Sequence, residues 1–384
     1  PTFSSNSINI SLKSDVGLYK FKSESLQNIS ITVTEISLNS ITLITPPTPS
    51  PVNWFTWDGT TITGLSNIGL NKTSIILPSI TTGISNDAFN RNTTIQSVDM
   101  SLTKITEIPD RIVDNNIGTV TINGINYYTE GTFSYCSSLT SVILPPSIKK
   151  IGSFAFRSCG VLKDIKLPNT LETIGYYSFY QCSSFVNLDI PDSVKNIGRF
   201  SYYNCTKIVS VKLPKNIQVI EVATFSSNTK LSSIIIPDSV TSIDLRSFEY
   251  CSSLTSIKLP INLRIIGANA FYQSGLVSIS FPENLSEIGD RAFSKCKNLS
   301  GQIILPNNIK TLGIEVFYDD VQITDVYIPN SLTSMKSFCF DYTDPSINGQ
   351  ASPIPGIVVY VSSNDTENLV KTYFRGTIIN LNRT

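Results

Sequence analysis

The sequence predicts a repeat solenoid with a parallel sheet of about 12 strands, preceded by a small all-β N-terminal module. Cysteines recur at a strict interval of 23 residues, at Cys136, Cys159, Cys182 and Cys205. Prolines keep the same interval from Pro145 to Pro260. A fixed period of this length is typical of stacked coils, each of which buries its apolar residues against its neighbours.

Residues 162–182 illustrate one coil. Within residues 162–167, polar and apolar residues alternate as Asp164, Ile165, Lys166 and Leu167. This is the pattern of a strand with one buried face. Pro168 ends the strand, because proline has no N–H to donate to a neighbouring strand. We expect Ile174 to bury the following turn and Phe179 to fill the middle of the coil.

Cysteine closes the coil, and the same position accepts other small polar residues, namely Asn92, Asn116, Asn228, Ser274, Asp320 and Thr343. Neighbouring strands lie about 4.8 Å apart, so distance alone allows disulfides between successive cysteines. Equivalent side chains of stacked coils, however, point the same way. We therefore interpret this position as a buried column that bonds the loop backbone, and expect seven free thiols. Cys339 lies in the slot of Ala155, one position before the phenylalanine, and is expected to be a core thiol.

Three sequence segments carry a resemblance to a known family: IGSFAFRSC at 151–159, IGYYSFYQC at 174–182 and IGDRAFSKC at 288–296. With the preceding strand and proline, they resemble the BspA-like leucine-rich repeats of bacterial and protist surface proteins. The resemblance covers residues 70–350. It rests on an Ile-Gly pair, an Ala-Phe pair and a cysteine that recur together at constant spacing. It implies a leucine-rich-repeat solenoid that serves in cell adhesion and host-protein binding without catalytic activity. It does not identify a ligand.

The domain organisation follows from changes in composition along the chain. Residues 1–45 alternate Ser and Thr with Ile and form the small β module, and 46–53 are a stiff Pro-rich linker. An N-terminal cap occupies 54–71, the repeats 72–348 and a C-terminal cap 349–384.

Details of the caps and of one irregular segment complete this organisation. Trp54 and Trp57 are expected to cover the open end of the solenoid or, alternatively, to stack against carbohydrate. Residues 97–133 are interpreted as two degenerate repeats aligned on Asn116, not as an insertion. The C-terminal cap is predicted to hold a strand at 357–361, a helix at 365–374 capped by Asn364 or Asp365, and a strand at 377–381.

Several classes of chemistry are excluded or unsupported. The chain has no histidine, so triads and metal sites that need one are impossible. No glycine-rich phosphate-binding motif follows a strand. With 29 basic and 29 acidic residues the net charge is zero, so the charge of the chain does not favour binding to nucleic acid or to an anionic membrane surface. We therefore predict no catalytic residues, cofactor or metal, and no membrane insertion, because no apolar run is long enough.

Outward positions on the predicted parallel sheet form the candidate partner-binding surface. They flank the buried residue of each strand and alternate charged with apolar side chains, a composition that suits a protein or glycan surface better than a small molecule. The alternative is that these positions are merely solvated. The candidate residues are Lys166, Asp189, Lys212, Ile235, Lys258, Ile304, Tyr327, Asp164, Asn187 and Asp325.

Two functions remain open from the sequence. The first is a non-enzymatic binding or adhesion module at a cell surface or outside the cell. The alternative is a structural or receptor-binding component of a virus or phage particle, or of another large assembly in a virion or the cytoplasm, docked by the N-terminal module. The absence of a leader before Pro1 and of an anchor favours this alternative.

Overall fold

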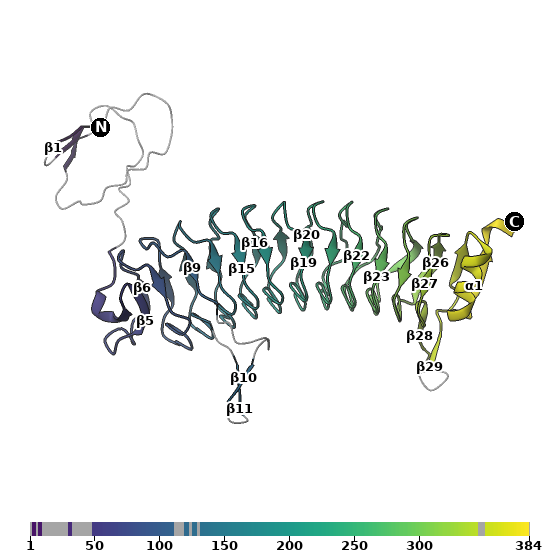
Figure 1. Cartoon of the computed structure of the whole chain (residues 1–384), viewed down its shortest axis with the longest axis horizontal. Coiled ribbons are helices and arrows are strands. Elements are labelled where there is room, and N and C mark those ends of the chain that lie inside the picture. Colours follow the sequence, from purple (N-terminus) through teal and green to yellow (C-terminus); the bar gives the residue numbers. More distant parts are fainter. Residues whose placement is uncertain are drawn as a thin grey trace. The chain divides into compact units, whose positions relative to one another are not determined.

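The computed structural model describes residues 2–4, 7–9, 30–32, 48–110, 119–122, 125–128, 131–344 and 350–383. The chain forms two compact units, 1–49 and 50–384. In the first unit, β1 (Thr2–Ser4), β2 (Ser7–Asn9) and β3 (Ser30–Thr32) form one sheet in which β2 and β3 are parallel. The second unit is a solenoid of stacked coils (Figure 1).

The first strand of each coil lies in a row of parallel sheets. The predicted parallel pairing is confirmed, but the row is divided into sheets of four, three and four strands. It is interrupted at residues 256–258 and 278–280, which are not in strands. The strands of this first row are β6 (Ser74–Ile76), β8 (Ser97–Asp99), β12 (Ser141–Ile143) and β14 (Asp164–Ile165); β16 (Asn187–Asp189), β18 (Ser210–Lys212) and β20 (Ser233–Ile235); and β24 (Ser300–Ile304), β26 (Gln322–Ile328), β30 (Val358–Val361) and β31 (Thr377–Asn380).

A second row of short parallel strands lies where the sequence predicted only a turn. Ile174 belongs to this row and pairs with Ile151 on one side and Ile197 on the other. Strands of two residues are too short to leave an alternating pattern in the sequence. The second row consists of β5 (Thr61–Leu65) and β7 (Gly83–Ile84); β9 (Glu107–Ile108), β13 (Lys150–Ile151), β15 (Thr173–Ile174) and β17 (Asn196–Ile197); and β19 (Val219–Ile220), β21 (Ser242–Ile243), β22 (Ile265–Ile266), β23 (Glu287–Ile288), β25 (Thr311–Leu312) and β27 (Ser334–Met335).

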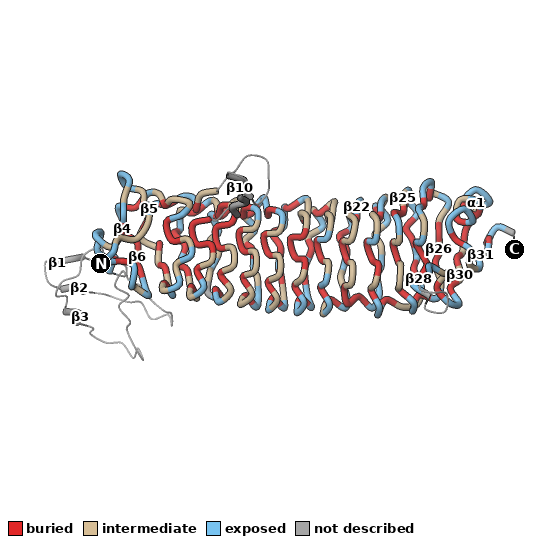
Figure 2. Tube along the Cα trace, turned by 90° about the horizontal axis from the view of Figure 1, so that it is seen from below, coloured by how far each residue is buried: buried red, intermediate tan, exposed pale blue. Residues whose placement is uncertain are grey.

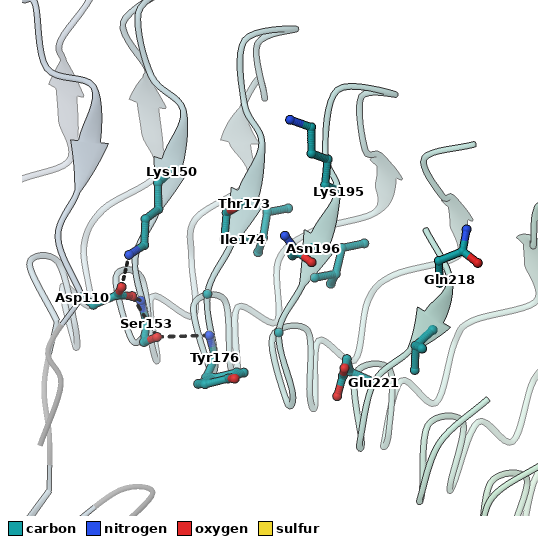
Figure 3. Close-up of a pocket in the computed structure, with 14 residues that line it drawn as sticks. Asp110, Lys150, Ser153, Thr173, Ile174, Tyr176, Lys195, Asn196, Gln218 and Glu221 are labelled. Carbon is teal, nitrogen blue, oxygen red and sulfur yellow. Dashed lines mark hydrogen bonds and ion pairs between the residues drawn. The ribbon is translucent and has the colours of Figure 1, made fainter. Parts of the chain in front are cut away.

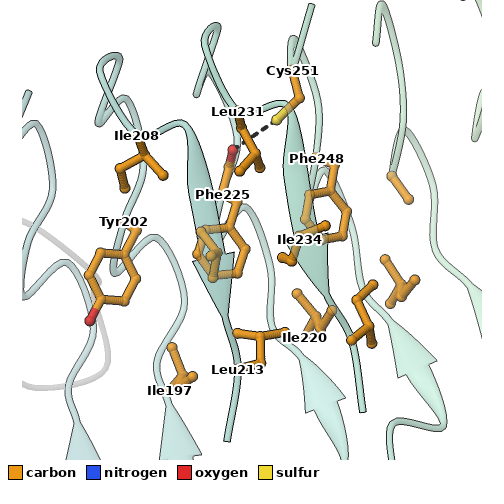
Figure 4. Close-up of a cluster of buried hydrophobic side chains, with 14 of the residues drawn as sticks. Ile197, Tyr202, Ile208, Leu213, Ile220, Phe225, Leu231, Ile234, Phe248 and Cys251 are labelled. Atoms are coloured by element: carbon orange, nitrogen blue, oxygen red, sulfur yellow. Dashed lines mark hydrogen bonds between the residues drawn. The ribbon is translucent and has the colours of Figure 1, made fainter. Parts of the chain in front are cut away.

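A column of aromatic rings runs through the middle of the coils. Phe156 stacks on Phe133 with ring centroids 5.1 Å apart and on Phe179 at 5.3 Å. The side chain of Phe179 is fully buried, so its predicted place in the core is confirmed. Apolar residues from both rows of strands surround the column (Figure 4), and Figure 2 shows that buried segments recur from coil to coil along the solenoid. Burial of this kind is the main stabilising term for stacked repeats.

The cysteine column bonds the loop backbone, as predicted. The Sγ of Cys159 donates to the carbonyl of Phe133 at 2.9 Å, and the Sγ of Cys182 donates to that of Phe156 at 3.1 Å. Asn228 replaces the thiol in a later coil and donates from Nδ2 to the carbonyl of Tyr202. All seven cysteines are free and buried, and Cys339 occupies the predicted slot before Phe340.

The residues two positions before and two positions after the core ring repeat an unusual backbone conformation. Tyr177 and Gln181 have positive φ values of 53° and 58°, and most other coils have two such residues. This conformation is costly for side chains other than glycine. Backbone hydrogen bonds to the next coil offset the cost, since the amide of Tyr177 donates to the carbonyl of Arg199 and that of Gln181 to Tyr203.

The interpretation of residues 97–133 as two degenerate repeats is wrong. Ser97 of β8 pairs directly with Ser141 of β12, and the ring of Phe89 stacks directly on Phe133 at 5.2 Å. No coil lies between them, so the extra residues form an insertion within one coil. It contains the antiparallel pair β10 (Thr119–Ile122) and β11 (Ile125–Tyr128). Asn116 lies outside the described residues.

The N-terminal end of the solenoid is covered by its first segment. There η1 (Val52–Trp54) leads into β4 (Phe55–Asp58), which pairs antiparallel with β5. Trp54 and Trp57 pack against the core, and Nε1 of Trp57 donates to the carbonyl of Val52 at 2.9 Å. These contacts favour the covering role over carbohydrate stacking.

The C-terminal end is closed by a hairpin, a helix and the last strands. The hairpin is β28 (Asp341–Asp344) with β29 (Gln350–Pro353), followed by α1 (Asn364–Tyr373) and η3 (Leu381–Arg383). Ser363, and not Asn364 or Asp365, caps the helix by accepting from the amide of Thr366. Thr343 lies exposed in β28, so its predicted place in the buried column is wrong.

Candidate binding surface

The first row of sheets brings the predicted outward residues into columns. Asn187 lies beside Ser210, and Asp189 beside Lys212, which lies beside Ile235. Further along, Gln302 lies beside Asp325 and Ile304 beside Tyr327. Parallel in-register pairing places equivalent residues about 4.8 Å apart on one face. We call this face the sheet face; it is made of the outward residues of the first-row strands from β12 to β31 and of the equivalent positions outside strands, such as Lys166 and Lys258.

Most of the predicted residues on the sheet face are exposed. Ile235 and Ile304 expose 65% and 62% of their surface, respectively, which is high for large apolar side chains. Asp325 and Tyr327 are half-buried. Asp164 takes its place in β14 beside Ser141, but its side chain lies outside the described part of the chain. The geometry therefore offers apolar and polar groups side by side.

Charge on the sheet face is only partly balanced. Lys212 pairs with Asp189 at 3.0 Å, and both side chains are more than half exposed. Within the described residues, Lys166 and Lys258 have no carboxylate at ion-pair distance. An exposed ion pair contributes little to stability, so these positions are free to serve recognition.

Two shallow hollows lie over the sheet face. Lys166, Asn187, Asp189 and Lys212 line the first, which has a volume of about 610 Å³. Lys258 lines the second, of about 610 Å³, together with Ser256 and Ser280 of the same outward columns and the exposed Ile261. The structure thus gathers four of the predicted residues in one hollow and places Lys258 in another.

The sequence reasoning missed the C-terminal continuation of the sheet face. Tyr327 is followed in register by Tyr360 and then Ile379, so a row of four apolar or aromatic side chains begins at Ile304. The rings of Tyr327 and Tyr360 stack with centroids 4.6 Å apart. Partial burial and the neighbouring Asp325 carboxylate raise the pKa of Tyr360. The predicted strand at 357–361 is a continuous apolar run without polar alternation and was assigned to the cap, so Tyr360 was not recognised as an outward residue.

A second concave region lies on the second row of sheets. This groove has a volume of about 440 Å³ and runs across β13, β15, β17 and β19 (Figure 3). At one end Asp110 pairs with Lys150 and accepts from the amide and hydroxyl of Ser153 at 2.6 and 2.9 Å. Partial burial would raise the pKa of Asp110, but the hydrogen bonds from Lys150 and Ser153 outweigh it and lower the pKa. No sequence pattern indicated this groove, because the second row of strands was not predicted.

The thiols are buried and protonated near neutral pH, and the described carboxylates are not clustered for metal binding. Burial raises the pKa of Cys136 and Cys251 to about 12, so neither is a thiolate nucleophile near neutral pH. No group of three or more Cys, Asp and Glu side chains among the described residues could hold a metal ion. No helix in the same residues is both long and apolar enough to cross a membrane.

The repeats match a known family model and several solved structures. The model, described as a BspA type leucine rich repeat region (6 copies), matches residues 66–185, 126–253 and 219–346. A leucine-rich repeat protein from Bacteroides ovatus is 21% identical over 85% of this chain and 97% of its own, with a TM-score of 0.50. This likeness shows the fold.

Two other solved structures cover a similar share of the chain. The pneumococcal vaccine antigen PcpA is 18% identical over 85% of this chain and 95% of its own, with a TM-score of 0.45. A leucine-rich cell surface protein from Faecalibacterium prausnitzii is 19% identical over 85% of this chain and 97% of its own, with a TM-score of 0.38. No curated protein matches the chain.

Proposed function

The chain belongs to the BspA-type leucine-rich repeat proteins, and we propose that it is a non-enzymatic binding module that docks a protein partner on its sheet face. Proteins of this type are often adhesion proteins of cell surfaces. We accordingly place the module at a cell surface or outside the cell. It needs no cofactor for this role.

One observation carries the proposal: the exposed isoleucines lie in register with charged residues along one continuous face. Ile235 follows Lys212 in the same outward column, and Ile304 begins the row that continues with Tyr327. Protein interfaces combine apolar and tyrosine anchors with a polar rim. Isoleucine is exposed at this outward position three times, at Ile143, Ile235 and Ile304, and with Tyr327 these side chains supply apolar anchors for a partner.

Binding experiments with the full chain test the proposal. The parent protein captures partners from a mixture of secreted and extracellular-matrix proteins, and surface plasmon resonance then measures their Kd. The sheet-face variant combines Lys166→Glu, Lys212→Glu and Lys258→Glu, and a second variant combines Ile235→Ser with Ile304→Ser. We expect each to raise Kd at least tenfold, and the effect of the lysine variant to be greatest at low salt.

A matched control carries the same charge change away from the sheet face. Lys207, Lys230 and Lys297 are exposed in the turns that precede the first strand of their coils. Their replacement by glutamate should leave Kd unchanged. If both sheet-face variants bind like the parent while removal of residues 1–51 abolishes binding, the site lies in the N-terminal unit and the assignment is wrong.

A further inference from the structure

We propose that the groove across β13, β15, β17 and β19 binds an uncharged linear oligosaccharide that runs along the solenoid. This site is separate from the sheet face and goes beyond the protein-binding function proposed above. Four features of the groove support it: glycine backbone in its lining, neutralised charges, an exposed aromatic ring and the spacing of the coils.

Two glycines that line the groove lie where successive coils approach each other closely. A Cβ on Gly175 would lie 2.5 Å from the amide nitrogen of Ser153, and one on Gly198 would lie 2.7 Å from the carbonyl carbon of Gly175. Contacts this short with backbone cannot be relieved without moving the coils apart. At Gly175 and Gly198 the lining of the groove is therefore backbone, and polar and aromatic side chains flank these glycines, with Thr173 and Asn196 opposite Tyr176 in Figure 3.

The charged groups of the groove are already paired. Lys150 pairs with Asp110, Lys195 with Glu172 at 2.7 Å, and Glu221 accepts from Arg199 at 3.2 Å. Neither lysine that lines the groove is free to bind a phosphate or sulfate without breaking its ion pair. An anionic ligand would also meet the Glu221 carboxylate. The groove therefore favours an uncharged ligand that forms many hydrogen bonds.

The uncharged side chains of the groove match the two kinds of surface that a sugar presents. The Tyr176 side chain is 51% exposed, and its backbone amide is held by the Ser153 hydroxyl at 3.3 Å. An exposed ring of this kind can pack against the C–H face of a pyranose while its hydroxyl remains in water. The Asn196 and Gln218 amides and the Thr173 hydroxyl each donate and accept, as sugar hydroxyls require.

The spacing of the coils distinguishes a sugar chain from a peptide. Thr173 and Asn196 are direct neighbours in register on β15 and β17. Parallel strands repeat about every 4.8 Å, which is similar to the length of one hexose in an extended β-linked chain, whereas an extended peptide advances about 3.3 Å per residue. Successive sugar units along the groove can therefore contact equivalent groups of successive coils, whereas successive residues of an extended peptide do not match the spacing of the coils.

Isothermal titration calorimetry with defined oligosaccharides tests the proposal. The probes are neutral β-linked glucose and N-acetylglucosamine oligomers of two to six units, with sulfated oligomers of the same length for comparison. We expect a neutral series to bind with an affinity that increases with length up to the span of the groove and changes little with salt. Tyr176→Ala should weaken binding at least tenfold, and Asn196→Ala should weaken it severalfold.

A tyrosine outside the groove provides the matched control. Tyr250 is 40% exposed on a loop of a later coil, and Tyr250→Ala should leave oligosaccharide binding unchanged. Circular dichroism checks that each variant is folded. Absence of binding to every neutral probe, equal binding by folded Tyr176→Ala, or tighter binding of the sulfated probes would each overturn the proposal. None of these outcomes bears on protein binding at the sheet face.

Discussion

Within the same coils, the inward and the outward positions differ in how many residue types they accept. The core ring position holds phenylalanine in nearly every coil, with Tyr202 as an exception whose buried hydroxyl has no partner among the described residues. One column of the sheet face holds Asp189, Lys212 and Ile235 in three successive coils. Stacked rings must fit their neighbours on both sides, whereas outward side chains meet water. Variation therefore marks the part of the repeat that is free to adapt to a partner.

The largest expected effect is a break in the inner column. Phe179→Ala removes a fully buried ring that stacks between Phe156 and Tyr202. Its replacement should lower the free energy of unfolding by about 3 to 5 kcal/mol. Urea unfolding followed by circular dichroism measures the loss. Ile235→Ala on the sheet face is the control, and an equal loss there would refute the contrast between inside and outside.

A second prediction concerns the one carboxylate in the cysteine column. Asp320 is fully buried, and neither of its side-chain oxygens forms a hydrogen bond of good geometry with the described residues, although the nearby backbone of Cys296 offsets part of the cost of burying the charge. Burial raises its pKa well above the ordinary value. Replacing it with the cysteine of other coils should increase the free energy of unfolding by about 1 to 3 kcal/mol at neutral pH.

The pH dependence of stability gives the sign of this effect. Because folding raises the pKa of this carboxyl, the group favours the folded state only while it is protonated. Its full contribution is present below the pKa that it has in the unfolded chain, about 3.9, and is lost as the pH rises towards its pKa in the folded protein. The stability gained by Asp320→Cys should therefore grow from pH 4 upwards. Unfolding curves of both proteins at several pH values measure the difference, and a constant difference would show that Asp320 does not titrate as proposed.

A smaller effect is expected from removing one thiol hydrogen bond. Cys182→Val keeps an apolar side chain of similar size but removes one of the two donors to the buried carbonyl of Phe156, which keeps only the backbone amide of Cys159. We expect a loss of about 1 to 2 kcal/mol in the free energy of unfolding. Cys182→Ser should cost less because the hydroxyl can donate in place of the thiol. If valine proves as stable as the parent, the column contributes packing and not hydrogen bonding.

The smallest effect on stability is expected on the sheet face itself. Combining Lys166→Glu, Lys212→Glu and Lys258→Glu should change the free energy of unfolding by no more than about 0.5 kcal/mol per site, because exposed ion pairs contribute little. Thermal unfolding measures the change. A collapse of the fold would mean that these lysines are structural, and would remove the basis for reading the face as a binding surface.

The repeat period was sufficient to predict the sheet face in detail. Because equivalent residues of stacked coils must lie side by side, counting along the sequence placed Asp189 beside Lys212 and Ile304 beside Tyr327, as the structure has them. The extension to Tyr360 was missed because the interval changes there, where the hairpin β28–β29 enters the chain between β26 and β30. The insertion after Asp110 was missed because its length is close to that of a repeat.

The sequence by itself determined the solenoid, its core column and the free thiols of the cysteine column, since each follows from a residue type that recurs at one interval. The tertiary structure alone decided the second row of strands and the groove on it. Strands such as β15, of two residues, are held by pairing with their neighbours and by the close approach of coils at Gly175, and not by local preference. A groove made of single residues from successive coils exists only once those coils are stacked.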